Sequence, residues 1–380
     1  MTFSVLGVTG SYYGLAVGLS ALCYLGLMLL LQRKSPLKAD AVLLYGVLGI
    51  PLGLIVSRAV YSAANFNYFF LVLEQPGKML YFWDGGYSMA GMLLGLVLAV
   101  LIAAKIAKYD FRRFLDAASL PLGLLLFGLR LAEGLTENFG VGRQVDPGAL
   151  AQSLPVLFIS ESFGAIELHR LAVFRYEAVF ALLLLLILFL FARGKNRRDG
   201  DLSMLFFALY GAAQIVFESM RNDGHMVYSF VRVQQVLALL SILIVLGMFC
   251  RRYGKAHGAR DAVTAAWTML PVLAVVLWMM IKPINHMLDL TGHIGIGLGV
   301  LAAMGVYLAF FLRLKGANLR LILSWFVTLG AVAASVMLEF SLDGSTNIFR
   351  DYGLLALCAA ILFLAPYSLY VSLGKGDANA

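Results

Sequence analysis

Long apolar blocks alternate with short polar connections along most of the chain. A membrane-spanning helix needs roughly 20 mostly apolar residues. Eleven segments approach that length with few charges: about 14–31, 41–62, 88–108, 117–131, 175–193, 203–220, 230–250, 262–282, 292–313, 321–341 and 352–373. The pattern therefore predicts an all-α polytopic membrane protein with about 11 transmembrane helices, of which the fourth is the shortest.

The composition supports this class, because 61% of the residues are hydrophobic and only 13% are charged. The N-terminal stretch MTFSVLGVTGSYYG has neither the basic region nor the cleavage pattern of a signal peptide, so we expect the first helix to be retained. Cys23, Cys250 and Cys358 fall in or at the end of apolar blocks without metal-type spacing. We expect them to be packing residues, and we assign no metal and no cofactor.

The basic residues gather in every second connection between the apolar blocks. These connections lie at residues 33–38, 105–113, 193–198, 251–260 and 313–320, and Lys375 follows in the tail. The positive-inside rule places them in the cytoplasm, so we expect the N-terminus outside and the C-terminus in the cytoplasm. The distribution of the net charge of +8 thus indicates orientation in a membrane and not binding to nucleic acid.

Two segments on the expected outer face are too long to be simple connectors. Residues 132–174 are too polar to cross the membrane, and loops of this length usually carry function. Residues 63–87 contain Trp83 and several Tyr and Phe residues, a composition typical of the membrane interface. We expect residues 132–174 to form a small head segment on the outer face.

The stretch LRLAEGLTENFGVGR at residues 129–143 brings charges to the end of an apolar helix. Arg130, Glu133 and Glu137 are spaced i, i+3 and i+7, so they share one helical face. Ionisable groups near hydrocarbon are costly and usually mark a functional site. The alternative is an ordinary helix end whose charges meet headgroups and water, and the spacing leaves both interpretations open.

The segment at 203–220 carries a polar stripe inside an apolar helix. Tyr210, Gln214, Glu218 and Arg221 follow in steps of four, four and three residues and lie on one face, which we do not expect to meet lipid. Near the outer end of the second segment, Arg58 precedes Tyr61 by three residues; Arg58 either belongs to the site or extends to the headgroups.

The motif FWDGGYSMAGMLLG begins at Phe82 and contains Gly85 and Gly86, which predict a tight turn. Its small residues either allow close helix packing or leave room for a lipid chain. Asp116 is expected to open the fourth helix as a first-turn acid that interacts favourably with the helix dipole.

Arginines and carboxylates gather at the outer ends of the second, fourth, fifth and sixth helices. Arg binds phosphate through two parallel hydrogen bonds, and partner carboxylates satisfy a buried Arg when the site is empty. We therefore expect an anionic phospholipid headgroup as ligand. The residues are Arg58, Arg130, Arg143, Arg170, Arg175 and Arg221 with Glu133, Glu137, Glu177 and Glu218.

The order of these motifs resembles the prolipoprotein diacylglyceryl transferases of bacteria. The matching pieces are SRAVY, WDGGYSMAG, Asp116, LRLAEGLTENFGVGR, YEAVF, YGAAQIVFESMR and VRVQQVLALLSI, which together cover about residues 14–252. The resemblance implies a seven-helix membrane domain at residues 1–253 with a central cavity, openings to the bilayer and an outer head segment. Residues 254–380 then form an additional four-helix membrane domain.

The resemblance implies transfer of the diacylglyceryl group of phosphatidylglycerol to the thiol of a lipobox cysteine in a secreted lipoprotein precursor. It implies catalytic roles for Arg130, Glu133, Tyr210, Gln214 and Glu218. It implies substrate-binding roles for Arg58, Tyr61, Gly85, Gly86, Asp116, Glu137, Arg143, Tyr176, Glu177 and Arg221, and we add Arg175, which lies on the same side. Gly142 and Gly211 also match family positions.

Four departures from the family pattern affect the expected site. Ala90 stands where the family has its proposed base, a His; Gln214 replaces a second key Arg, and Glu133 replaces an Asn. Residues 172–174 replace a Pro-Ser-Gln sequence. Arg170 or Arg175 could supply the missing charge, and His169 or His225 could supply the missing base. A changed donor or acceptor therefore stays open, and so does a catalytically degenerate relative that binds an anionic phospholipid or a lipoprotein precursor as a partner or regulator.

The C-terminal part carries one polar feature, KPINHMLDLTGH. His286, Asp289 and His293 are spaced i, i+3 and i+7 and could supply three metal ligands, but Pro283 and Gly292 favour a loop or an interfacial turn. A transporter remains a third interpretation of the chain; it rests on the helix count alone, and the sequence shows no inverted repeat.

Overall fold

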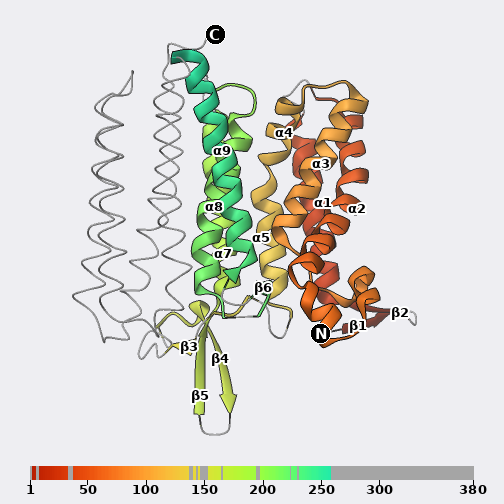
Figure 1. Cartoon of the computed structure of the whole chain (residues 1–380), viewed down its shortest axis with the longest axis vertical. Helices are drawn as coiled ribbons and strands as arrows, with labels where there is room; N and C mark the ends of the chain where they lie inside the picture. Colours follow the sequence, from red (N-terminus) through yellow and green to blue (C-terminus); the bar gives the residue numbers. More distant parts are fainter. Residues whose placement is uncertain are drawn as a thin grey trace, which may run out of the picture. The chain divides into compact units, whose positions relative to one another are not determined.

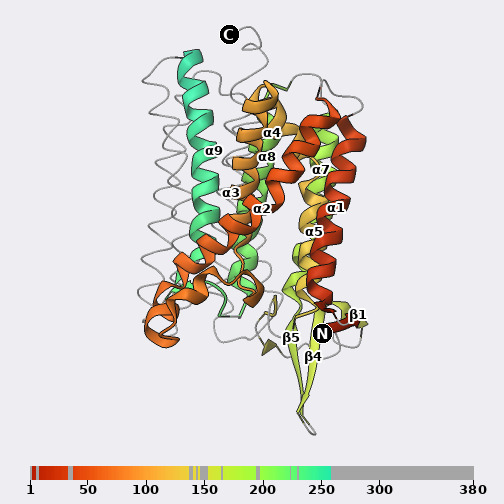
Figure 2. The ribbon, with the colours of Figure 1, turned by 90° about the vertical axis from the view of Figure 1, so that its right-hand side faces the viewer.

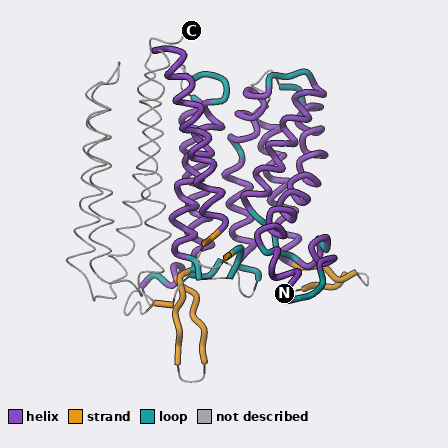
Figure 3. Tube along the Cα trace, in the orientation of Figure 1, coloured by secondary structure: helices purple, strands orange, loops and turns teal. Residues whose placement is uncertain are grey.

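The fold is known from a computed structural model (Figure 1). The structure describes residues 2–257 except residues 6–7, 33–36, 137–139, 143, 146–152, 164–165, 194–196, 223 and 229–230. Helices make up most of this part, and the strands are few and short (Figure 3). Four of the expected membrane helices, from residue 262 onward, lie outside it.

Six helices of the described part are long and apolar enough to span a membrane. They are α1 (Tyr12–Gln32), α2 (Ala39–Ala64), α3 (Met89–Ala107), α7 (Val173–Ala192), α8 (Asp201–Met220) and α9 (Val233–His257). Many of their Leu, Ile, Val and Phe side chains are exposed, as expected for surfaces that face lipid. The all-α polytopic class is confirmed for the described residues.

The fourth expected span is a broken helix, and its predicted extent of 117–131 is wrong. It consists of α4 (Phe111–Ser119) and α5 (Leu122–Glu133), which meet at an angle of 45°. The break falls at Pro121, which has no N–H for the helical ladder. The Tyr24 hydroxyl donates to the Ala118 carbonyl at 3.0 Å and lies 2.8 Å from the Tyr45 hydroxyl. This buried pair of tyrosines satisfies a carbonyl at the bend and helps to set the direction of α5.

A small β-sheet forms the described part of the expected head segment. It contains β3 (Gln144–Val145), β4 (Phe158–Phe163) and β5 (Ile166–Leu171) in the antiparallel order β3-β5-β4, and the turn η4 (Pro155–Leu157) precedes β4. The β4–β5 hairpin projects beyond the end of the helices at which α5 ends and α7 begins (Figures 1 and 2). We call this end of the bundle the hairpin end.

Short elements complete the N-terminal half of the chain. β1 (Thr2–Val5) and β2 (Val8–Ser11) form an antiparallel pair before α1. Between α2 and α3, the chain forms three single turns, η1 (Tyr68–Val72), η2 (Pro76–Leu80) and η3 (Phe82–Asp84). Trp83 is 77% exposed in this segment, and Leu71 and Leu80 are also exposed. Such exposed apolar side chains fit the expected interfacial segment at residues 63–87.

The chain divides into two compact units. The first unit comprises residues 1–206 and 220–229, and the second comprises residues 207–219 and the chain from residue 230. In the first unit, α2 and α3 pack at close range: a Cβ at Gly95 would lie 2.4 Å from the Leu52 carbonyl oxygen, and one at Gly91 would lie 2.9 Å from the Val56 carbonyl oxygen. The small residues after Ser88 therefore serve helix packing, which confirms one of the two interpretations of that motif.

In the second unit, α8 packs against α9 through Gly211. A Cβ there would lie 2.6 Å from Ser241 Oγ and 3.0 Å from the Ala238 carbonyl oxygen. The short strand β7 (Val231–Arg232) precedes α9 in this unit, whereas β6 (Val227–Tyr228) belongs to the first unit. The domain boundary expected near residue 254 stays a prediction.

Candidate functional site

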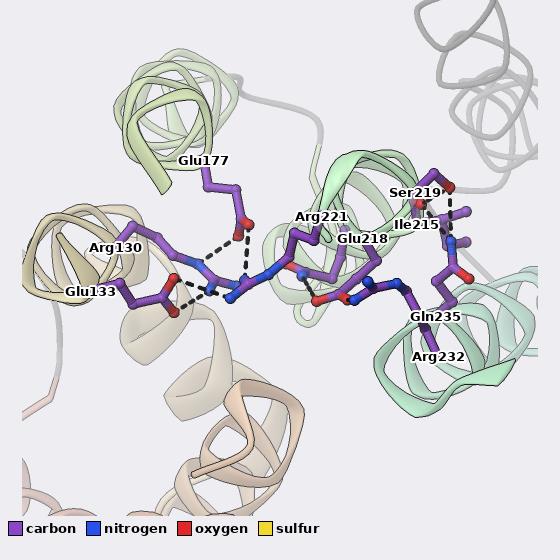
Figure 4. A network of polar contacts seen from close by, with 10 residues as sticks. Arg130, Glu133, Glu177, Ile215, Glu218, Ser219, Arg221, Arg232 and Gln235 are labelled. Atoms are coloured by element: carbon purple, nitrogen blue, oxygen red, sulfur yellow. Dashed lines mark hydrogen bonds and ion pairs between the residues drawn. The ribbon is translucent and has the colours of Figure 1, made fainter. Parts of the chain in front are cut away.

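Four charged side chains of the first unit form one closed network. Arg130 and Glu133 come from the last turn of α5, Glu177 from the first turns of α7, and Arg221 follows the end of α8. Arg130 contacts Glu133 (Nη1–Oε1, 2.5 Å) and Glu177 (Nε–Oε2, 2.6 Å). Arg221 contacts the second oxygen of each carboxylate, at 3.2 Å in Glu177 and 3.4 Å in Glu133. Each carboxylate therefore bridges both guanidinium groups (Figure 4).

Three members of the network are almost fully buried, and one is less so. The side chains of Arg130, Glu177 and Arg221 are 3% exposed, whereas that of Glu133 is 16% exposed. The formal charges of the four groups cancel, which is what permits this burial, because an unpaired buried charge costs several kcal/mol. The interpretation of residues 130–133 as an ordinary helix end that faces headgroups and water is therefore wrong.

Arg58 lies in α2 and holds the chain that leads into α3. Its guanidinium donates to the carbonyl oxygens of Gly85 and of Gly86 (3.1 Å). It also donates to the carbonyl oxygens of Lys78 (2.7 Å) and Met79 (3.0 Å). Because Arg58 is only 3% exposed and makes these contacts, the interpretation in which it extends to the headgroups is wrong.

Gly85 and Gly86 form the predicted tight turn, with φ angles of +74° and +72°. L-residues with a Cβ rarely adopt such angles. A Cβ at Gly86 would lie 2.4 Å from Tyr61 Cε1 and 2.9 Å from Arg58 Nη1. Arg58, Tyr61 and the two glycines are therefore brought together, as the sequence predicts.

Tyr87 continues this turn, and its hydroxyl donates to the Phe82 carbonyl oxygen. Burial raises the pKa of the Tyr87 phenol above its ordinary value, so the side chain stays neutral at physiological pH.

Arg175 and Tyr176 hold the head segment in place. Arg175 Nη1 donates to the carbonyl oxygens of Val156 (2.8 Å) and Phe158 (3.2 Å), and the Tyr176 hydroxyl donates to that of Leu157 (2.5 Å). These contacts join the start of α7 to η4 and β4. Both side chains were expected to bind substrate, but these bonds are to the backbone of the head segment and not to the Arg–Glu network.

Asp116 is engaged at the other end of the helices. It lies near the end of α4, so the expectation of a first-turn acid is wrong. Its carboxylate accepts hydrogen bonds from the backbone N–H of Gly200 (2.8 Å) and Ser203 (2.9 Å), at the start of α8. Asp116 thus stabilises the N-terminus of a different helix, and α4, which carries it, lies away from the β4–β5 hairpin (Figure 1).

A second polar cluster lies within the second unit. Gln214 Nε2 donates to Glu218 Oε1 at 3.0 Å. Arg232 Nη1 contacts Glu218 Oε2 at 3.3 Å (Figure 4). Tyr210 lies one helical turn before Gln214. Arg232 and Gln235, which donates to Ser219 Oγ at 2.8 Å, were not singled out from the sequence. The signal was present in the polar residues of VRVQQ at the start of an apolar helix.

Several expected residues cannot be placed. Glu137, Arg143, His286, Asp289 and His293 lie outside the described residues. Gly142 is described and forms an isolated antiparallel bridge with Arg221. Within the described ranges, no group of three or more His, Cys, Asp or Glu side chains is arranged to hold a metal ion.

Comparison with known proteins identifies the family. The sequence model of the family described as prolipoprotein diacylglyceryl transferase matches residues 1–251. A relative from Bacillus velezensis named phosphatidylglycerol–prolipoprotein diacylglyceryl transferase is 27% identical over 256 residues, which is 66% of this chain and 90% of the relative. A relative with the same name from Bacillus licheniformis is 24% identical over 258 residues, which is 68% of this chain and 93% of the relative. Another from Clostridioides difficile is 25% identical over 247 residues, which is 64% of this chain and 91% of the relative. The chain therefore belongs to the prolipoprotein diacylglyceryl transferase family, a family of membrane-embedded transferases.

Proposed function

We propose that this protein transfers the diacylglyceryl group of phosphatidylglycerol to the lipobox cysteine of a lipoprotein precursor, at the outer face of a bacterial plasma membrane. Two observations support the proposal: the names of the relatives, and the buried network of two guanidinium groups and two carboxylates at the hairpin end of the bundle. The proposed orientation, with the N-terminus outside, follows from the distribution of basic residues.

The reaction replaces the C–O bond to phosphate with a C–S bond and transfers the thiol proton to a base. The cysteine thiol loses its proton to a base, because the thiolate is the nucleophile. The sulfur attacks the glycerol carbon that bears the phosphate ester, so a C–S bond forms and the C–O bond to phosphate breaks. The electron pair leaves with glycerol phosphate, and the additional negative charge on its phosphate develops in the transition state. Groups that stabilise this charge lower the barrier.

Arg130 and Arg221 suit this task, because both are held in fixed orientations by the same two carboxylates. In the structure the network is neutral, so a bound phosphodiester would add a negative charge. Glu133 is the carboxylate that is most easily displaced, because it is the most exposed of the four groups and lies at the end of α5. We infer that the donor phosphate displaces Glu133 from at least one guanidinium, while Glu177 keeps both in place.

The second candidate function is a lipid-binding relative without turnover. Ala90 and Gln214 favour it, since neither side chain can act as a base or carry a positive charge. The Arg–Glu network is compatible with both functions, because binding and transfer both need the phosphate to be held.

The test uses the purified full-length protein in vesicles that contain phosphatidylglycerol, with a synthetic peptide that carries a lipobox cysteine. Mass spectrometry of the peptide should show a thioether-linked diacylglyceryl group. Arg130→Gln should abolish the product, whereas Gln144→Ala on β3, which lies in the head segment and outside the network, should retain it. A folded wild-type protein that binds phosphatidylglycerol without forming product would support the second candidate and refute the first.

A further inference from the structure

The turn from Gly85 to Ala90 is fixed against one face of α2. Ser57 Oγ donates to the Ser88 carbonyl oxygen at 2.7 Å, and the Ser88 N–H donates to the Ser57 carbonyl oxygen at 3.2 Å. Ser88 caps α3, and its Oγ accepts a hydrogen bond from the Gly91 N–H. Ala90, the second residue of α3, is thereby held beside this face of α2.

Tyr61 lies one helical turn beyond Ser57 on that face and contacts the same turn. The ring of Tyr61 is so close to Gly86 that a Cβ there would collide with it. On the Tyr61 ring lies the imidazole of His225, with ring centroids 5.3 Å apart and planes inclined by 27°. The imidazole of His225 and the turn at Gly86 therefore lie against the same Tyr61 ring, although His225 and Ala90 are 135 positions apart in the sequence.

His225 is also close to the Arg–Glu network. It follows Arg221 by four residues, and it is near enough to Glu133 for the two charges to interact. Tyr61 from α2 and Glu133 from α5 lie near the imidazole, and Arg58 lies over the Tyr61 ring, 5.5 Å from its centroid. The residue is partly exposed, and its Nδ1 atom is buried.

The other histidine considered as a base, His169, has a different environment. It lies in β5, directly opposite Ser160 of β4, and its Nδ1 is 3.0 Å from Ser160 Oγ. This pair belongs to the β4–β5 hairpin, so the contacts of His169 are with the hairpin and not with Tyr61 or the turn at Gly86.

We propose that His225 is the base that accepts the thiol proton of the acceptor cysteine, in a chain whose α3 begins without a side chain able to do so. This inference rests on the proposed function. The neutral imidazole takes the proton from sulfur; the thiolate forms the C–S bond, and the phosphate leaves with the C–O electron pair. The proton then passes from the imidazolium to the released glycerol phosphate or to water. In this scheme His225 activates the thiol, and the guanidinium groups of the Arg–Glu network stabilise the leaving phosphate.

The test compares three variants of the full-length protein in the phosphatidylglycerol vesicle assay. His225→Phe keeps a ring that can stack on Tyr61 but removes the proton acceptor. A purely structural role of His225 would therefore predict retained activity. We expect a loss of about 100-fold or more in kcat, in line with the contribution of a general base. His169→Gln is the matched histidine control and should retain wild-type turnover. The double variant Ala90→His/His225→Phe should turn over at least tenfold faster than His225→Phe alone, because it restores an imidazole beside the same turn.

The pH dependence gives a readout that a structural role would not change. Protonation of an imidazole base removes its ability to accept the thiol proton, so the pH–rate profile of the wild-type protein should show an acid limb. This limb should disappear in His225→Phe, whose residual rate should rise with the fraction of thiolate in solution. A His225→Phe variant with wild-type kcat and an unchanged acid limb would overturn the inference while leaving the proposed function intact. Absence of product in the wild-type protein would instead refute the proposed function.

Discussion

Glu177→Gln tests the physical basis of the Arg–Glu network. In the wild-type protein, the two oxygens of Glu177 contact Arg130 at 2.6 Å and Arg221 at 3.2 Å, and the Glu177 side chain is 3% exposed. Glutamine has nearly the same shape, but the formal charge of the network changes from zero to +1. Its amide also directs an N–H₂ donor toward guanidinium groups that are themselves donors.

The magnitude follows from the burial. Removing one partner of a buried ion pair costs about 3–5 kcal/mol, because the remaining charge has no compensation. We therefore expect Glu177→Gln to lower the free energy of unfolding by this amount. Glu161→Gln is the matched control: Glu161 pairs with Arg170 at 3.7 Å, and their side chains are 35% and 37% exposed. Such an exposed pair is worth only about 0–1 kcal/mol.

The assay is equilibrium unfolding in mixed detergent micelles, followed by a probe of helix content. A second comparison uses the double variant Arg130→Gln/Glu177→Gln, in which the charge is again balanced. We expect the double variant to be less destabilised than the sum of the single variants by at least about 1 kcal/mol, which is typical of directly coupled residues. The reasoning would be refuted if Glu177→Gln cost no more than Glu161→Gln, or if the two substitutions were additive.

Three further predictions concern individual contacts. Gly86→Ala should lower the free energy of unfolding by more than about 1 kcal/mol in the same assay, because φ is positive there and a Cβ would collide with Tyr61. Gly77→Ala is the control, since a Cβ there would meet no atom within 4 Å, and an equal effect of the two substitutions would contradict the argument. Asp116→Ala should lower the free energy of unfolding by about 1–3 kcal/mol, because two buried N–H groups lose their acceptor, and it should leave the KM for phosphatidylglycerol unchanged. A raised KM would instead show that Asp116 takes part in substrate binding. Arg232→Gln should reduce kcat/KM by roughly 10- to 100-fold, and adding Gln214→Arg should restore most of the activity, because both positions reach the same Glu218 carboxylate. A double variant as inactive as Arg232→Gln alone would refute a shared role of the two positions.

Within the part of the chain that the structure describes, the sequence predicted six membrane helices well, because length and hydropathy determine them with little help from tertiary structure. It did not predict the break in the fourth span. The apolar block from residue 117 reads as one short helix, whereas the true element begins at Phe111 in a stretch with two arginines and bends at Pro121. The misplaced start led to the wrong role for Asp116. Only the packed structure shows that its carboxylate reaches the start of α8, since that contact joins residues more than 80 positions apart.

The contacts of the Arg–Glu network were predicted in part. Helical spacing placed Arg130 with Glu133, and the polar stripe of α8 drew attention to Glu218 and Arg221. The sequence could not show that Arg130, Glu133, Glu177 and Arg221 close into one network, because each pairing other than Arg130–Glu133 joins distant segments. Arg58, Arg175 and Tyr176 have the residue types of a phosphate site, yet backbone carbonyls occupy them in the structure. Residue type alone does not distinguish a ligand-binding arginine from one that holds a loop.

The central claim is that paired guanidinium groups bind the phosphate that leaves when the thioether forms. The most direct measurement is the amount of glycerol phosphate released per thioether formed, by phosphorus NMR and peptide mass spectrometry on one sample. The account predicts one glycerol phosphate per modified cysteine in the wild-type protein, and a loss of about 10- to 100-fold or more in both products when Arg221 is changed to Gln. Thioether formation at the wild-type rate in Arg221→Gln, or without release of glycerol phosphate, would contradict it.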